Sequence, residues 1–120
     1  MLMRRMSVAF VATMVIALLP VTVADARRVA TTSQKRAIAG KHRRCWRVYV
    51  SSVDARYASL EFNAKAYKSA ECAPLASNGI DIYRRRDGRW RHVSGMSDCP
   101  SRLPGVPAAV YRDLTRAYCR

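Results

Sequence analysis

Residues 83–94, YRRRDGRWRHVS, concentrate side chains that bind anions: five arginines, one tryptophan and one histidine within twelve positions. Guanidinium groups bind phosphates and carboxylates through parallel N–H donors, and an exposed tryptophan offers a flat surface for stacking. We therefore expect a polyanion-binding site formed by these side chains: Arg84, Arg85, Arg86, Arg89, Trp90 and Arg91. The alternative is a solvated hairpin tip in a small basic protein, with Trp90 turned into the core.

Two further sets of residues have the composition of hydrolytic sites. Asp81, His92 and Ser94 match a nucleophile–base–acid triad. Glu61 or Glu71 together with His92 matches the acid–base pair of a small secreted ribonuclease. A flat sheet provides neither an oxyanion hole nor a cleft for the triad, and no nuclease motif surrounds the glutamates. We therefore predict a protein that is not an enzyme, with a ribonuclease as a less favoured alternative.

The cysteines indicate how a small domain is held together. The chain contains four cysteines without any C-x-x-C pair, and His42 and His92 lack ligand spacing to them, so the sequence indicates no metal site and no cofactor. An even number of cysteines in an exported chain indicates disulfides, with three possible connectivities. We favour Cys45–Cys72 and Cys99–Cys119, each closing a loop of about 20–30 residues worth about 3 kcal/mol in the chain-entropy model.

The N-terminus has the three parts of a secretory signal peptide. Two arginines are followed by an uncharged apolar run at residues 6–19, and residues 24–26 place small side chains where a signal peptidase reads them. The run is shorter than the roughly 20 residues that a membrane span requires. We therefore predict that residues 1–26 are removed and that a secreted, extracellular or cell-envelope protein begins at Arg27.

The remaining chain is strongly basic and long enough for one small domain. Residues 1–26 hold two of the 22 basic and one of the 8 acidic residues, so their removal lowers the net charge only from +14 to +13. Residues 27–44 contain seven Lys or Arg residues, no acidic residue and no sustained apolar period. This composition predicts a disordered basic arm, followed by a folded domain over residues 45–120.

The domain shows the patterns of an antiparallel sheet. Apolar and polar residues alternate at 46–53 and at 56–64, which is the period of half-buried strands, and residues 65–70 are expected to extend the second strand. Asp87-Gly88 separates two further strand-like runs, 80–86 and 89–95. This dipeptide predicts a hairpin, because a type I′ turn needs positive φ at both central residues.

The predicted turn sets the pairing within the hairpin. On one face it pairs Arg86 with Arg89, Arg84 with Arg91, and Ile82 with Val93. On the other face it pairs Arg85 with Trp90, Tyr83 with His92, and Asp81 with Ser94. Like charges directly opposite each other destabilise a sheet, so the arginine pairs require either solvent or an anionic partner.

A helix is predicted near the C-terminus. Pro107 suits the first residue of a helix, and four residues recur at helical spacing on one face: Val110, Leu114, Ala117 and Tyr118. We therefore expect an α+β domain with about four antiparallel strands in a meander, one C-terminal helix and two disulfides.

Several of these positions form a pattern: a tryptophan soon after a turn glycine, then a cysteine, a Leu-Pro step and a final V-x-x-D-L-x-x-x-x-C segment. They are Gly88, Trp90, Cys99, Leu103, Pro104, Val110, Asp113, Leu114 and Cys119. With this pattern, residues 45–120 resemble small exported proteins of actinobacterial type that have no assigned function. The resemblance implies export and a disulfide-linked domain, and it brings no catalytic residue.

These expectations together predict a small exported domain whose basic surface contacts anionic polymers of the cell wall, extracellular nucleic acid or an acidic protein. The second hypothesis is a secreted protease inhibitor that uses the proline-rich loop at residues 99–107, held within Cys99–Cys119. Alternatively, residues 99–107 only connect two elements, and their prolines lower the entropy of the unfolded chain.

Overall fold

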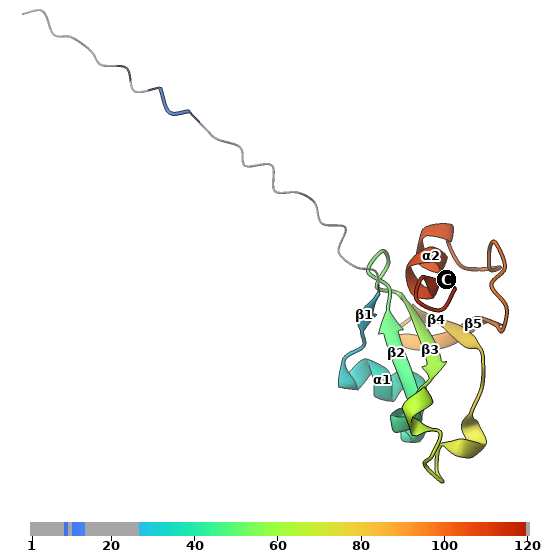
Figure 1. Cartoon of the computed structure of the whole chain (residues 1–120). Helices are drawn as coiled ribbons and strands as arrows, with labels where there is room; N and C mark the ends of the chain where they lie inside the picture. The colour runs from blue at the N-terminus through green and yellow to red at the C-terminus, as the bar shows by residue number, and fades with distance from the viewer. Residues whose placement is uncertain (1–8, 10, 14–26, 120) are drawn as a thin grey trace, which may run out of the picture.

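A five-stranded antiparallel sheet with the order β1-β2-β3-β4-β5 forms the centre of the computed structural model, which describes residues 9, 11–13 and 27–119 (Figure 1). The strands are β1 (Arg28–Val29), β2 (Trp46–Val50), β3 (Tyr57–Phe62), β4 (Ile80–Arg86) and β5 (Arg89–Met96). The helices in these ranges are α1 (Thr32–Ala39), α2 (Ala108–Thr115) and three 3₁₀ helices, η1 (Gly40–Cys45), η2 (Ala64–Ala66) and η3 (Ala73–Leu75). The predicted α+β class, meander and C-terminal helix are confirmed. The predicted signal peptide at residues 1–26 lies almost entirely outside the described residues.

The prediction that residues 27–44 form a disordered arm is wrong, because this segment has both local and tertiary contacts. β1 extends the sheet by pairing Arg28 with Val50. Thr31 and Gln34 form a capping box at the start of α1, in which each side chain accepts a hydrogen bond from the backbone N–H of the other residue. The high positive charge predicted disorder, but these contacts order the segment against β2.

The main hydrophobic core lies between α2 and one face of the sheet. Alternate positions of β3 and β4 face the helix, since Ser59 pairs with Ile82 and both side chains are buried. The core side chains are Tyr57, Ile80, Ile82, Leu103, Val106, Val110, Tyr111 and Leu114. The predicted apolar stripe is confirmed at Val110 and Leu114, and Pro107 precedes α2 as its N-cap residue. The prediction is wrong at Ala117, which is exposed because α2 ends at Thr115.

A second buried layer lies on the opposite face of the sheet. Val48, Val50, Ala58 and Leu60 alternate with the residues that face α2, and they too are buried. α1 lies against β2 (Figure 1). The alternation in β3 predicts a half-buried strand, but β3 is covered on both faces because Ser59, polar in that pattern, is fully enclosed on the α2 side.

Both predicted disulfides are confirmed. Cys45–Cys72 joins the last residue of η1, just before β2, to the segment between η2 and η3. Cys99–Cys119 joins the exit of β5 to the chain that follows α2. The first bond is buried and the second lies near the surface, since Cys45 is fully enclosed and Cys99 is exposed.

The chain after β3 does not continue as a strand, so the predicted extension over residues 65–70 is wrong. The Asn63 side chain accepts a hydrogen bond from the Lys65 backbone N–H and caps η2. A side chain that bonds locally to the backbone competes with the sheet ladder. Turns then lead to Cys72, where the disulfide holds the segment.

Asp113 on α2 is a buried carboxylate that joins three parts of the fold. It is 4% exposed and accepts hydrogen bonds of 2.7 Å from Ser51 Oγ, from the Ser52 backbone N–H and from the Arg27 backbone N–H. Burial by itself would raise the pKa of Asp113, but these hydrogen bonds together hold it below its ordinary value. The carboxylate thereby fixes the β2–β3 loop and residue 27 against α2.

We expect acid to destabilise the protein by protonating Asp113. Because its pKa is lowered in the folded state, the ionised carboxyl stabilises the fold above the unfolded-state pKa of about 3.9, and this stability is lost as the pH falls below that value. The Tm should fall between about pH 6 and pH 3, and should fall less in Asp113→Asn protein. Asp54, whose pKa is lowered by its hydrogen bond with Arg56, contributes equally in both proteins. Equal acid sensitivity of the two proteins would contradict the role of Asp113.

Candidate anion-binding hairpin

The turn between β4 and β5 has the predicted conformation. Asp87 and Gly88 have φ values of 52° and 73°, as the two central residues of a type I′ turn require. Next to the turn the predicted pairs are confirmed: Arg86 with Arg89, Arg85 with Trp90, Arg84 with Arg91, and Tyr83 with His92. The arginines of β4 and β5 therefore face one another across the strands.

A β-bulge changes the pairing farther from the turn. Ile82 pairs with Ser94 and Asp81 pairs with Gly95, so the predicted pairs Ile82–Val93 and Asp81–Ser94 are wrong. The extra residue is Val93, whose side chain packs against the main core. A bulge places two residues of one strand opposite one residue of the other. Here the bulge lets the Val93 side chain pack against the core, which stabilises the irregular pairing.

Four arginines at the tip are exposed, and none of them forms an ion pair within the described residues. These tip arginines are Arg85, Arg86, Arg89 and Arg91. Arg84 differs from them, because it is half-buried with its guanidinium carbon 5.7 Å from the centre of the Tyr57 ring. Trp90 is also half-buried and is not one of the core residues beneath α2. Of the six residues predicted to bind anions, the four tip arginines are therefore exposed, whereas Arg84 and Trp90 are half-buried.

The nearest acidic side chain on β4 does not neutralise the tip. Asp81 Oδ1 lies 2.8 Å from His92 Nε2, and the His92 ring meets the Tyr83 ring edge-on at 5.4 Å between centroids. Burial, and then the charge of Asp81, raises the pKa of the Tyr83 phenol, so this group stays neutral. The turn residue Asp87 is the acidic side chain that lies within the arginine cluster.

The structure does not assemble the hydrolytic sets considered from the sequence. The bulge pairs Ser94 with core-facing Ile82, which takes Ser94 off the face that carries Asp81 and His92. Glu61 is paired with Arg27, and Glu71 lies 3.3 Å from His42. Within the described residues, His92 therefore has Asp81 as its acidic neighbour in place of either glutamate.

One cluster has the residue types of a metal site. Ligand atoms of His42, Cys45 and Glu71 lie within 4.8 Å of one another. Cys45 is bonded to Cys72, however, and a disulfide sulfur is not the thiolate that binds zinc. The histidine and the glutamate alone fall short of the four ligands of a structural zinc site.

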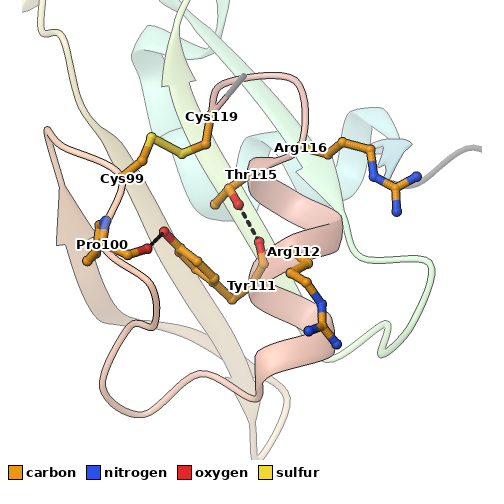
Figure 2. A pocket seen from close by; sticks show the side chains of 7 residues that line it. All are labelled: Cys99, Pro100, Tyr111, Arg112, Thr115, Arg116 and Cys119. Atoms are coloured by element: carbon orange, nitrogen blue, oxygen red, sulfur yellow. Dashed lines mark hydrogen bonds between the residues drawn. A yellow bond between two sulfur atoms is a disulfide. The ribbon is translucent and has the colours of Figure 1, made fainter.

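A shallow depression of about 420 Å³ lies between α2 and the Cys99–Cys119 disulfide (Figure 2). It is lined by Cys99, Pro100, Tyr111, Arg112, Thr115, Arg116 and Cys119. Its hydroxyl groups are already used, because Tyr111 donates to the Pro100 carbonyl and Thr115 donates to the Tyr111 carbonyl. Arg112 and Arg116 extend away from the disulfide in Figure 2, so they add positive charge at the rim and none inside. Their i, i+4 spacing on the polar side of α2 is the sequence signal for this basic edge.

The segment at residues 99–107 is held in the fold at two points. Leu103 and Val106 are both buried in the main core. Arg102 and Pro104 remain exposed on either side of Leu103. The segment therefore does not present consecutive side chains to solvent around Leu103, and the inhibitor hypothesis stays a prediction.

No protein-family model, curated protein or solved structure matches this chain. The resemblance to exported actinobacterial proteins therefore stays a prediction. Among the residues that the structure describes, no helix is long and apolar enough to cross a membrane. The two disulfides are compatible with an extracellular protein.

Proposed function

We propose that this chain is an exported, non-enzymatic protein whose β4–β5 hairpin binds anionic polymers. The observation that supports the proposal is the group of four tip arginines, which are exposed and form no ion pair in the described part of the chain. They stand on a hairpin whose strands pair without interruption from Tyr83–His92 to the type I′ turn. The positive groups are thus held in place before any ligand arrives, which lowers the entropy lost on binding.

The charge balance of the domain supports the same proposal. Five of the acidic side chains already have partners: Asp54, Glu61, Glu71, Asp81 and Asp113. Within the described residues, Arg27 and Arg56 are the Lys or Arg residues that form ion pairs. Since Arg86 faces Arg89 and Arg84 faces Arg91, the hairpin holds like charges opposite each other. An anionic ligand would relieve this repulsion.

The expected ligand is a polymer with repeated negative charges, such as cell-wall polyanions or extracellular nucleic acid. Among residues 27–119, the hairpin consists of two strands and a turn without a helix that could enter a nucleic-acid groove, and its tryptophan, Trp90, is half-buried. Binding would therefore depend on charge and would show little sequence preference. An acidic protein is a second partner with the same chemistry.

Polymer binding is expected to fall steeply with salt because it releases condensed counter-ions. Replacing Arg86, Arg89 and Arg91 with serine should lower the slope of log affinity against log salt concentration by about one unit per lost contact, or about three in total. Arg84 is kept because it packs on Tyr57. The measurement is a heparin or duplex-DNA titration at several salt concentrations, using protein exported from cells that express the full chain.

The matched control removes the same charge elsewhere. Arg36, Arg43 and Arg44 are exposed on α1 and η1, so their replacement by serine lowers the net charge equally. In this control variant, the slope of log affinity against log salt concentration should stay close to that of the natural protein. Equal losses in the two triple variants would show that binding follows net charge alone, and an unchanged slope in the hairpin variant would overturn the proposal. Material retained in the cells with residues 6–19 still attached would overturn the export part separately.

A further inference from the structure

The predicted first residue of the exported chain is held in a defined place. The Arg27 guanidinium pairs with Glu61 on β3, and its central carbon lies 3.7 Å from the centre of the Tyr49 ring on β2. The same side chain lies 3.4 Å from the Leu114 carbonyl on α2. Residue 27 is therefore fixed by three elements, although it is the residue at which a signal peptidase is expected to cut.

The backbone nitrogen of Arg27 points at the buried carboxylate of Asp113, with a distance of 2.7 Å to Oδ1. The other groups that bond to this carboxylate are neutral: the Ser51 hydroxyl, the backbone N–H and hydroxyl of Ser52, and the Val53 backbone N–H. A carboxylate that is 4% exposed with neutral partners loses its hydration without gaining a counter-ion.

Cleavage between residues 26 and 27 would change the chemistry of that nitrogen. Hydrolysis adds the hydroxyl of water to the Ala26 carbonyl carbon and leaves the Arg27 nitrogen as a primary amine, which is protonated at neutral pH. We propose that Asp113 is the binding site for the α-ammonium group that processing creates at Arg27. The inference depends on the proposed export, because it needs the new N-terminus to form at this residue.

The ion pair would make the processed chain more stable than the same chain with a blocked or displaced N-terminus. In the unprocessed chain the Arg27 amide still donates one hydrogen bond to Asp113, but it carries no charge. The ammonium keeps this donor and adds the missing positive charge, and a charge-assisted hydrogen bond is about twice as strong as a neutral one. Export would thereby be followed by a tightening of the fold around α2.

The pH dependence has a definite sign. Pairing with Asp113 should raise the pKa of the Arg27 amine above its ordinary value of about 8. Its stabilisation is then present below about pH 8 and is lost as the pH rises through the raised pKa. The sheet face packed here carries Arg47, Tyr49, Tyr57 and Glu61, and the β2–β3 loop carries Asp54 and Arg56. The remaining charged or titratable groups on the packed elements are Tyr111 and Arg112 on α2, Arg116 at its C-cap, and the Arg27 guanidinium.

The experiment compares two exported proteins made from the full chain. One is the natural chain, and the other has a glycine inserted between residues 26 and 27, which moves the amine about 3.8 Å away but keeps the Arg27 N–H. Intact mass first establishes where each exported chain begins. At about pH 6.5 the natural N-terminus should give a Tm higher by about 5 °C or more, and the difference should shrink toward about pH 9.5.

Two further measurements isolate Asp113 and the amine. In Asp113→Asn protein the two N-termini should give the same Tm. The ¹⁵N NMR titration of the α-amine should show a raised pKa in the natural chain and an ordinary pKa in the glycine-extended chain, and it remains informative if the Asn variant does not fold. Tyr49→Phe in both chains keeps the ring and removes the phenol as a source of alkaline titration.

The outcomes separate this inference from the proposed function. An exported chain that begins at another residue would overturn the proposed processing and this inference together. A chain that begins at Arg27, with an ordinary amine pKa and the same Tm as the glycine-extended chain, would overturn this inference alone and leave polyanion binding untouched.

Discussion

Replacing Asp113 with alanine is expected to lower the free energy of unfolding by about 3–5 kcal/mol, a large part of the stability of a domain this size. The carboxylate accepts from Ser51 Oγ and from two backbone N–H groups, those of Ser52 and Arg27. Alanine leaves these three donors, which form the shortest bonds to the carboxylate, without their acceptor in a region that water reaches poorly. Each unsatisfied buried donor costs about 1–3 kcal/mol. Urea unfolding followed by circular dichroism measures the change.

The matched control is Asp54→Ala, which removes a carboxylate of the same loop region from an exposed pair. Asp54 bonds to Arg56 at 2.8 Å, and the Arg56 side chain is 63% exposed. Exposed pairs contribute little to stability, so this variant should unfold close to the natural protein. If Asp113→Ala were as stable as Asp54→Ala, Asp113 would not be the buried junction that its contacts indicate.

Removing the Cys45–Cys72 bond by double alanine substitution is expected to cost about 3 kcal/mol or more, and more than removing Cys99–Cys119. The two bonds enclose loops of 27 and 20 residues, so their entropic contributions are similar. They differ in burial, because Cys45 and Cys72 are 0% and 2% exposed whereas Cys99 is exposed. Alanine at the buried pair also leaves unfilled space in the protein interior.

Denaturant unfolding of the two double variants tests this order, with the m value showing whether each variant still unfolds in one step. Because Cys99 is exposed, we also expect the two disulfides to differ in how readily they are reduced. Mild reduction followed by thiol labelling and mass analysis should open Cys99–Cys119 first, since access limits thiol exchange. A more costly loss of Cys99–Cys119, or earlier reduction of Cys45–Cys72, would contradict the assignment of the buried bond as the stronger constraint.

The features of this protein that the sequence determined by itself are those encoded by neighbouring residues. Asp87-Gly88 predicted a turn with two positive φ values, and the pairing next to it followed because each strand position has one partner. The spacing of Val110 and Leu114 predicted which side of α2 is buried. The number and spacing of the cysteines left three possible pairings, of which the predicted sequential one is present.

At the candidate site the sequence predicted which arginines lie opposite each other, but it did not predict the solvent exposure of each arginine. Arg84 is half-buried because it meets Tyr57 on β3, whereas Arg86 next to it along the same face lies beyond the end of that strand. The bulge at Val93 also followed from packing, since that side chain contacts the core formed with α2. The residues of one hairpin do not indicate which other elements will cover it, so neither contact could be predicted from residues 80–96.

Only the tertiary structure decided the fate of residues 27–44 and the role of Asp113. The Arg27 backbone and the Asp113 carboxylate are 86 residues apart in the chain, and Arg27 reaches Glu61 across the sheet. The composition of residues 27–44 predicted disorder because the segment has many like charges and no sustained apolar period. Both are properties of the segment alone. The contacts that order the segment form when β1, β2 and α2 come together, and hydrogen bonds in a buried, poorly hydrated place are strong enough to outweigh that local preference.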